Sequence, residues 1–201
     1  MGNRSTSTKE GPERVASTPE IGVVEALNSG NREHALTLLM DAYGDSLYRF
    51  CRQMTREASL AEDVHQMTFV QAYQGLGDFA FRSSFRTWLF SIARHRCLDA
   101  LKILRRRRAR FELVDEPPHR PDGTDSADQR LEAIDRNLTL ERCLGSLAPR
   151  VREAILLRFR EESSYTEMAL VCREKPATLQ ARVARAMPLL RRCLEESGVA
   201  P

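Results

Sequence analysis

The chain has 201 residues, which is enough for one medium domain or two small ones. Of these residues, 42% are hydrophobic and 29% are charged, and the net charge is +3. It has no apolar run long enough to cross a bilayer, and its first 19 residues lack the apolar core of a secretory signal, so we expect a cytoplasmic protein without direct membrane insertion. The five cysteines are Cys51, Cys97, Cys143, Cys172 and Cys193. No two of them have CxxC spacing, so neither a disulfide framework nor a zinc site is indicated, and we expect all five to be small core residues.

The charges are distributed unevenly along the chain. Residues 1–111 contain 17 Lys and Arg against 12 Asp and Glu, residues 112–128 contain 1 against 6, and residues 129–201 contain 13 against 10. This distribution indicates two basic modules joined by an acidic, proline-containing tether. Such an arrangement is typical of a protein in which both modules contact a polyanion.

Nearly all of the chain outside this tether is predicted to be helical. Apolar residues recur at intervals of three and four, and alternating β-branched runs are absent, so we expect an all-α fold. Thr18 and Pro19 predict the start of a first helix, which Gly30 ends. Asn31 predicts the start of a second helix, within which Gly44 is expected to break or bend the chain.

A third helix is predicted from Ser59, because Ser59 and Glu62 have the spacing of a capping box. It is expected to stop near Gly75 and to be followed by a loop. The next helix is predicted to begin near Ser84 and to run toward Arg110.

The stretch from Phe79 to Arg110 contains five of the thirteen aromatic residues and ends in a basic run. Aromatic side chains can stack on unpaired bases, and Arg and Lys can neutralise phosphates, so the combination suits the opening of a DNA duplex. An aromatic cluster at the start of a helix is also typical of a protein core, and this stretch alone leaves both interpretations open.

Beyond the tether, four further helical segments are predicted. A helix covers Leu131–Leu144, another opens at Pro149, and Ser164 and Glu167 form a second capping box. Pro176 is placed as the first residue of a last helix.

The last two helices have the spacing of a helix-turn-helix. The inner stripe of the last helix is Leu179, Val183, Ala186 and Leu190. Its exposed arc is expected to comprise Ala177, Ala181 and Ala184, flanked by Thr178, Gln180 and Arg185. Any all-α core contains helical hairpins, so this spacing alone does not decide for DNA binding.

Three motifs make the chain resemble the extracytoplasmic-function (ECF, group IV) sigma factors of the sigma-70 family. AEDVHQMTFVQAY (61–73) is similar to the polymerase-docking helix, FRSSFRTWLFSIARHRCLDALK (81–102) to the segment that melts and recognises the −10 element, and SYTEMALVCREKPATLQARVARA (164–186) to the −35 recognition helices. The resemblance implies two helical domains: sigma region 2 over residues 18–111 and sigma region 4 over 129–201. A disordered extension (1–17) and a flexible linker (112–128) complete the expected organisation.

The resemblance also implies roles for particular residues and partners. Polymerase docking falls on Glu62, Asp63 and Gln66. The residues implied in binding the −10 element are Phe79, Phe81, Arg82, Ser83, Phe85, Arg86, Trp88, Arg94, His95, Asp99, Lys102, Arg105 and Arg106. Of these, Trp88 is expected to support the loop rather than stack on a base. Binding of the −35 element falls on Thr178, Gln180, Ala181, Arg182 and Arg185. The implied partners are core RNA polymerase, through its β′ clamp coiled coil and its β flap, promoter DNA and an anti-sigma factor.

The chain departs from the family pattern at several positions. Met67 stands where the docking motif usually has Glu, and His95 stands where Asn is common, with a hydrogen bond to Asp99 expected one turn away. Arg173 replaces the turn glycine, and Pro188 lies inside the last helix. Since the exposed face of that helix offers three alanines, we expect it to contact the −35 element mainly through phosphates, shape and apolar contact.

Two other functional classes remain open from the sequence. A helix-turn-helix regulator would bind DNA without binding core polymerase, and a helical adaptor would show no salt-dependent DNA binding. No catalytic constellation is present, since the four histidines are scattered and no phosphate loop occurs, so we expect neither an enzyme nor a cofactor nor a small-molecule substrate.

Overall fold

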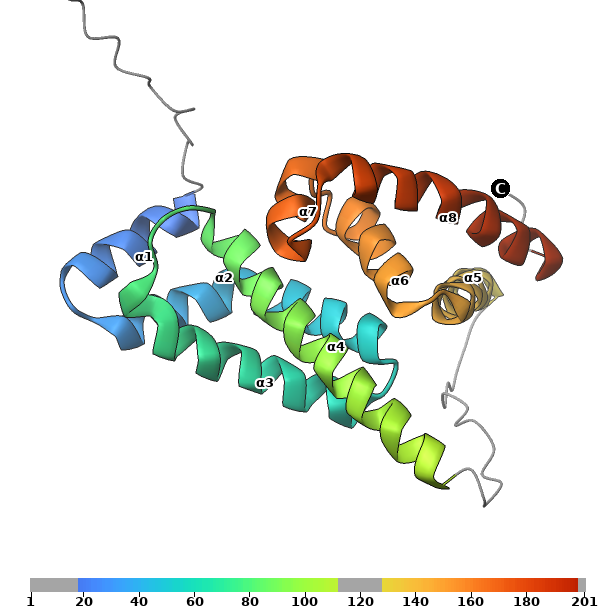
Figure 1. Ribbon diagram of the computed structural model, residues 1–201, viewed down its shortest axis with the longest axis horizontal. Helices are drawn as coiled ribbons and strands as arrows, with labels where there is room; N and C mark the ends of the chain where they lie inside the picture. The colour runs from blue at the N-terminus through green and yellow to red at the C-terminus, as the bar shows by residue number, and fades with distance from the viewer. Residues whose placement is uncertain (1–17, 112–127, 199–201) are drawn as a thin grey trace, which may run out of the picture.

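The computed structural model of the protein describes residues 18–111 and 128–198, and every element in these ranges is helical (Figure 1). The N-terminal module comprises α1 (Thr18–Asn28), α2 (Arg32–Thr55), α3 (Ala58–Gly75), the short 3₁₀ helix η1 (Leu76–Asp78) and α4 (Phe85–Phe111). The C-terminal module comprises α5 (Asp128–Ser146), α6 (Pro149–Ile155), the π-helical turn η2 (Leu156–Arg160), α7 (Tyr165–Cys172) and α8 (Pro176–Glu196). The expected disordered extension and the tether, except Asp128, lie outside the described residues.

Side-chain caps start three of these helices where the sequence predicts them. The Asn31 side chain accepts a hydrogen bond from the His34 amide at the start of α2. Ser84 accepts one from the Thr87 amide at the start of α4. Ser164 forms the expected capping box with Glu167, the third residue of α7, because the side chain of each accepts a hydrogen bond from the backbone amide of the other.

The capping box predicted at Ser59 and a break of the second helix at Gly44 are both absent from the N-terminal module. Helix α3 begins at Ala58, and Ser59 donates to the Glu57 carboxylate at 3.2 Å instead of forming a capping box with Glu62. Gly44 does not break α2, which is continuous over 24 residues because the apolar positions on both sides of the glycine are buried in the same core.

In the C-terminal module, the last helix starts at Pro176 as expected and is continuous through Pro188. Pro188 has no backbone N–H, so the Ala184 carbonyl lacks its helical hydrogen-bond partner. Both residues lie on the exposed side of α8, where water can satisfy that carbonyl. The turn before α8 uses Arg173 in the left-handed conformation, with φ 54°, a conformation that is more favourable for glycine.

The cysteines divide into two groups, and one of them contradicts the sequence analysis. Cys51, Cys97 and Cys172 are buried free thiols, as expected. Cys143 in α5 and Cys193 in α8 instead form a disulfide. The two are 50 residues apart in sequence, so no short-range spacing signals that the two helices bring them together.

The two modules pack against each other. Helix α7 lies beside α4, helix α6 contacts α2, and the buried apolar side chains of both modules form one connected core (Figure 1). The arrangement places the first half of α4, which contains much of the predicted −10 site, next to the helix-turn-helix.

Candidate nucleic-acid interface

An aromatic loop, residues 76–85, leads from α3 into α4 and exposes one of its rings. Phe79 and Phe85 stack with ring centroids 4.4 Å apart, and Phe85 is buried. Phe81 meets both rings edge-on and is 57% exposed, with a left-handed φ of 53°. A large aromatic residue held exposed at a positive φ is uncommon and marks Phe81 as the loop residue available to a ligand.

Trp88 lies beneath this loop and supports it. Its ring contacts Phe79 at a centroid distance of 5.0 Å, and it is half-buried against the core. A Cβ at Gly75 would lie 3.1 Å from the Trp88 ring, so the close approach of α3 favours glycine there. The position agrees with a supporting role for Trp88.

A hollow of about 860 Å³ adjoins the aromatic loop. Polar side chains from α3, the loop and α4 line it, among them Gln71, Ser83 and His95. Val171 and Arg173 of the C-terminal module complete its wall. The hollow therefore lies between the aromatic loop and the turn of the helix-turn-helix.

The exposed surface of α4 contains part of the predicted −10 site. His95 and Asp99 form the expected contact, with Nε2 and Oδ2 3.3 Å apart on the surface. Lys102, Arg105 and Arg106 are exposed and available to phosphates.

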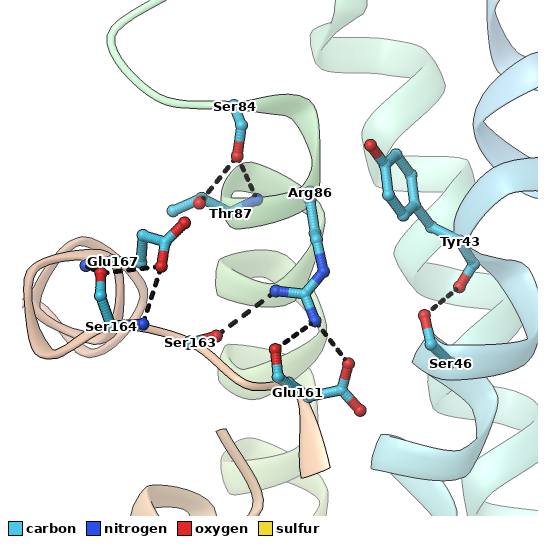
Figure 2. A network of polar contacts seen from close by, with 9 residues as sticks. All are labelled: Tyr43, Ser46, Ser84, Arg86, Thr87, Glu161, Ser163, Ser164 and Glu167. Atoms are coloured by element: carbon cyan, nitrogen blue, oxygen red, sulfur yellow. Dashed lines mark hydrogen bonds and ion pairs between the residues drawn. The ribbon is translucent and has the colours of Figure 1, made fainter. Parts of the chain in front are cut away.

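Two arginines predicted for the −10 site point toward the C-terminal module instead of toward solvent. Arg86 donates to the Glu161 carboxylate at 2.7 Å and to the Glu161 carbonyl at 2.8 Å (Figure 2). Arg94 Nε lies 3.1 Å from Glu153 Oε1, and the Arg94 side chain is only 11% exposed. These partners lie 75 and 59 positions further along the chain, beyond any helical spacing.

Glu153 is the most deeply buried charged group in the described residues, with no exposed surface. Burial raises the pKa of Glu153, while Arg94 and a hydrogen bond from the Cys172 thiol lower it by less. Its Oε2 has no hydrogen-bond partner among the described residues. Because Glu153 and Cys172 belong to the C-terminal module and Arg94 to the N-terminal one, this cluster joins the two.

Arg152, beside Glu153, contacts the end of α2. It donates to the Met54 carbonyl at 2.8 Å and, within its own module, to the carbonyls of Leu144, Gly145 and Leu147 at 2.9, 2.8 and 3.1 Å. Burial, helped by the neighbouring Arg56, lowers the pKa of Arg152 to about 10, so the guanidinium stays charged at neutral pH. These contacts have no signal in the sequence, because Arg150 and Arg152, two arginines close behind Pro149, are typical of a helix surface.

The predicted polymerase-docking residues Glu62, Asp63 and Gln66 are exposed on α3. The same helix continues into exposed apolar side chains that our prediction did not include: Met67 (45%), Val70 (48%) and Tyr73 (39%). Met67 and Val70 lie four residues after Asp63 and Gln66, and Tyr73 lies three residues after Val70, so they continue along the same face of the helix. That repeat, offset from the buried stripe, is the signal by which the sequence reveals them.

In the helix-turn-helix, the predicted −35 residues Thr178, Gln180, Ala181 and Arg185 are exposed on α8. Arg182 is instead engaged within the module, because its two terminal nitrogens bond to the two carboxylate oxygens of Glu174. This hydrogen bonding lowers the pKa of Glu174. Glu174, which follows Arg173 in the turn, thus supplies the partner that holds Arg182.

The arrangement as a whole is that of a two-module helical DNA-binding protein. An exposed aromatic ring and a basic helix lie on one module, and a helix-turn-helix lies on the other. No described helix is long and apolar enough to span a membrane. Within residues 18–111 and 128–198, no group of three His, Cys, Asp or Glu side chains is placed to hold a metal ion.

Comparison with known proteins defines the family. Residues 39–109 match the model for sigma-70 region 2, and residues 137–190 match the model for sigma-70 region 4. The ECF RNA polymerase sigma factor SigC of Mycobacterium tuberculosis is 33% identical over 156 residues, which cover 78% of this chain and 81% of SigC. SigW of Bacillus subtilis is 24% identical over 86% of this chain and 95% of its own. The chain belongs to the ECF sigma factors of the sigma-70 family, which are non-enzymatic and bind core RNA polymerase to initiate transcription.

Solved structures agree with the fold. CnrH, in complex with the cytosolic domain of CnrY, is 27% identical, with a TM-score of 0.64 over 90% of this chain and 99% of CnrH. The sigma factor RpoE of Bartonella quintana, solved with the anti-sigma factor NepR, is 24% identical, with a TM-score of 0.59 over 78% of this chain and 94% of RpoE.

Proposed function

We propose that this sigma factor acts in the cytoplasm and melts its promoters through the aromatic loop, residues 76–85, with Phe81 as the surface on which an extruded −10 base stacks. The supporting observation is the 57% exposure of Phe81 above a packed platform of Phe79 and Phe85. Removing a base from the duplex costs a few kcal/mol, and stacking on an aromatic ring returns about 1–3 kcal/mol. The hollow beside the loop offers polar groups to the edge of that base.

Residues further along α4 supply the electrostatic part of the same site. Lys102, Arg105 and Arg106 contact the phosphates of the −10 region, which adds affinity and salt dependence without sequence information. His95 and Asp99, exposed and close together, are placed to contact bases beside the extruded one.

Docking to core polymerase uses the face of α3 that begins at Glu62 and Asp63. The acidic and amide groups suit a basic coiled coil such as the β′ clamp, and the exposed Met67, Val70 and Tyr73 add apolar area to the contact. The C-terminal module docks on the β flap and presents α8 to the −35 element. With alanines on its exposed face, α8 binds mainly through phosphates and shape.

Phe81→Ala tests the base-capture role. We expect about tenfold weaker binding to promoter DNA with an unpaired −10 segment, corresponding to the loss of one stacked base, with binding to the closed duplex unchanged. Phe81→Tyr should retain most of the affinity. Phe159→Ala, which removes a similarly exposed ring (54%) from the C-terminal module, is the matched control. Equal binding by Phe81→Ala and the wild type would exclude Phe81 as the stacking residue.

Two of the similar solved structures contain a partner protein: RpoE of Bartonella quintana is bound to the anti-sigma factor NepR, and CnrH is bound to the cytosolic domain of CnrY. We propose that this chain also has an anti-sigma factor.

A further inference from the structure

The hollow beside the aromatic loop contains a glutamine whose amide is held in one orientation. Gln71 of α3 lines the hollow, and Arg96 Nε of α4 donates a hydrogen bond to Gln71 Oε1 at 2.8 Å. A guanidinium has only donors, so its partner in the amide is the oxygen and never the nitrogen. The Gln71 amide therefore cannot turn over without losing this bond, and its NH₂ group is the end that is left for a ligand.

The NH₂ group of Gln71 has no acceptor within the described residues. The Gln71 side chain is partly buried, whereas Gln74, almost one turn further along α3, lines the same hollow but is exposed and has no arginine partner in the described part of the chain. A side chain that is locked by packing and by a hydrogen bond offers its donor in a defined direction. Of these two glutamines, only Gln71 is therefore built to discriminate between ligands.

Ser91 gives the same wall an acceptor. Its hydroxyl donates to the Trp88 carbonyl at 2.7 Å, and Ser91 lines the hollow. A hydroxyl has one proton, so the Ser91 oxygen can only accept from a ligand while that bond is present. The wall thus combines a fixed donor at Gln71 with an acceptor at Ser91.

An extruded base can be distinguished in this hollow only by its edge. Stacking tolerates every base, because each has a π-face, so Phe81 alone does not choose among them. Enzymes that extrude a base read it by hydrogen bonds to its Watson–Crick edge. The volume of the hollow, about 860 Å³, lies in the range of sites that hold small ligands, so there is room for a base beside these groups.

The bases fall into two classes by the polarity of this edge. Thymine and guanine carry a keto oxygen, O4 or O6, next to a ring N–H, whereas cytosine and adenine carry an amino group, N4 or N6, next to a bare ring nitrogen. The NH₂ donor of Gln71 pairs with the keto oxygen but meets an amino group donor to donor. The Ser91 acceptor suits the ring N–H of the keto class in the same way.

We propose that Gln71, positioned by Arg96, makes the extruded-base site selective for a keto base, thymine or guanine, over cytosine and adenine. Gln71 is the specificity-determining residue, because its NH₂ group contacts the base. Arg96 is a positioning residue that acts through Gln71. The inference rests on the proposed function, since it takes the hollow to receive the edge of the base that stacks on Phe81.

The test uses pairs of bases that differ mainly in this polarity. Four fluorescein-labelled duplexes carry a short bubble in which one strand has uracil, cytosine, hypoxanthine or adenine at every position and the opposite strand has abasic sites. Uracil and cytosine share a ring, as do hypoxanthine and adenine, so stacking is nearly equal within each pair. The full chain should bind the keto probe of each pair about fivefold more tightly, which corresponds to one hydrogen bond.

Gln71→Glu should reverse this preference. The carboxylate still accepts the bond from Arg96, but it presents an oxygen where the wild type presents NH₂, so cytosine and adenine should become the preferred probes. Gln74→Glu is the matched control, since it makes the same change of charge on the same wall. It should weaken binding to all four probes alike and keep the wild-type ratio.

Variants of Arg96 test its positioning role. Arg96→Met should bring the ratio between keto and amino probes close to one, because the Gln71 amide can then turn over. Arg96→Lys, which can still donate to Gln71 Oε1, should retain part of the preference. Circular dichroism verifies folding, and each ratio is measured within one protein, so a general loss of affinity leaves it unchanged.

Two results would overturn the inference: equal binding of keto and amino probes by the wild type, or a Gln71→Glu variant that prefers the same probes as the wild type. Failure of the proposed stacking is distinct, because Phe81→Ala would then bind every probe as tightly as the wild type, while the ratio would still decide the role of Gln71. If the protein bound none of the four probes, both the proposed function and this inference would be rejected.

Discussion

At the residue scale, the structure assigns contrasting environments to side chains that look alike in sequence. Phe79, Phe81 and Phe85 are spaced closely, yet Phe85 is buried and Phe81 is the exposed ring. Arg86 and Arg94 are engaged with carboxylates, whereas Arg105 and Arg106 are exposed. The aromatic and basic stretch is thus partly core, partly module contact and partly free surface.

The buried Glu153 gives a pH dependence whose sign follows from its raised pKa. A carboxyl whose pKa is higher in the folded chain than its ordinary value of 4.5 contributes stability that is fully present below pH 4.5 and is lost as the pH rises through the folded pKa. The difference in free energy of unfolding between the wild type and Glu153→Gln should therefore shift against the wild type as the pH rises from 4.5 to neutrality.

Urea unfolding of both proteins across this range measures that difference. Glu195→Gln, which changes an exposed carboxylate, controls for general charge effects. A difference that shifts in favour of the wild type with rising pH would mean that Arg94 outweighs burial at this site.

At the scale of the helices, α3 has one face that packs and one that is available for docking. Val70→Asp introduces a charge into the exposed apolar part of the docking face without touching the core, since Val70 is 48% exposed. We expect about tenfold weaker binding to core polymerase, measured by fluorescence anisotropy, because apolar contact in the proposed docking face is lost.

The control for this variant is Ile21→Asp on α1, where an equally exposed apolar residue lies outside the matched family region. If both variants bound core polymerase as the wild type does, the apolar part of α3 would have no role in docking.

The disulfide between α5 and α8 gives a second prediction at this scale. By closing a loop of 50 residues, it should raise the free energy of unfolding by about 2–4 kcal/mol over the reduced protein. Chemical denaturation with and without reductant measures the difference, and Cys193→Ser should be insensitive to reductant. Titration of the unfolded, unreduced protein should find three free thiols, and five would contradict the bond.

Particular elements show how far the sequence determines the structure. The cap at Asn31, the capping box at Ser164 and the start of α8 at Pro176 were predictable because the signal and its effect lie within four residues. The capping box at Ser59 failed although its spacing was correct, because Ser59 bonds to Glu57 and α3 starts one residue earlier. The exposed face of α8 was predicted correctly, since the burial of its stripe follows helical periodicity.

At the scale of the whole molecule, the contacts between modules were not predictable. Arg86 meets Glu161 across 75 residues, and Arg152 meets the end of α2 across nearly 100. Such pairs depend on how two helical modules pack, for which local spacing holds no information. The family resemblance therefore assigns Arg86 and Arg94 to DNA, but nothing in the sequence reveals that carboxylates of the same chain already hold them.

The functional conclusion depends on the two modules acting together on one polymerase. A stand-alone helix-turn-helix regulator would bind DNA but would neither bind core polymerase nor open a promoter. Family membership, the exposed face of α3 and the exposed Phe81 all favour the sigma-factor function.

Run-off transcription with core polymerase on a genomic promoter library tests the sigma-factor function most directly. The protein, added to core polymerase, should yield discrete transcripts whose templates share a −10 and a −35 element. Single-base substitutions should reduce transcription more strongly at −10 than at −35, since the exposed arc of α8 contains three alanines, which have no side-chain donor for a base edge. DNA binding without any transcript above core polymerase alone would contradict the account.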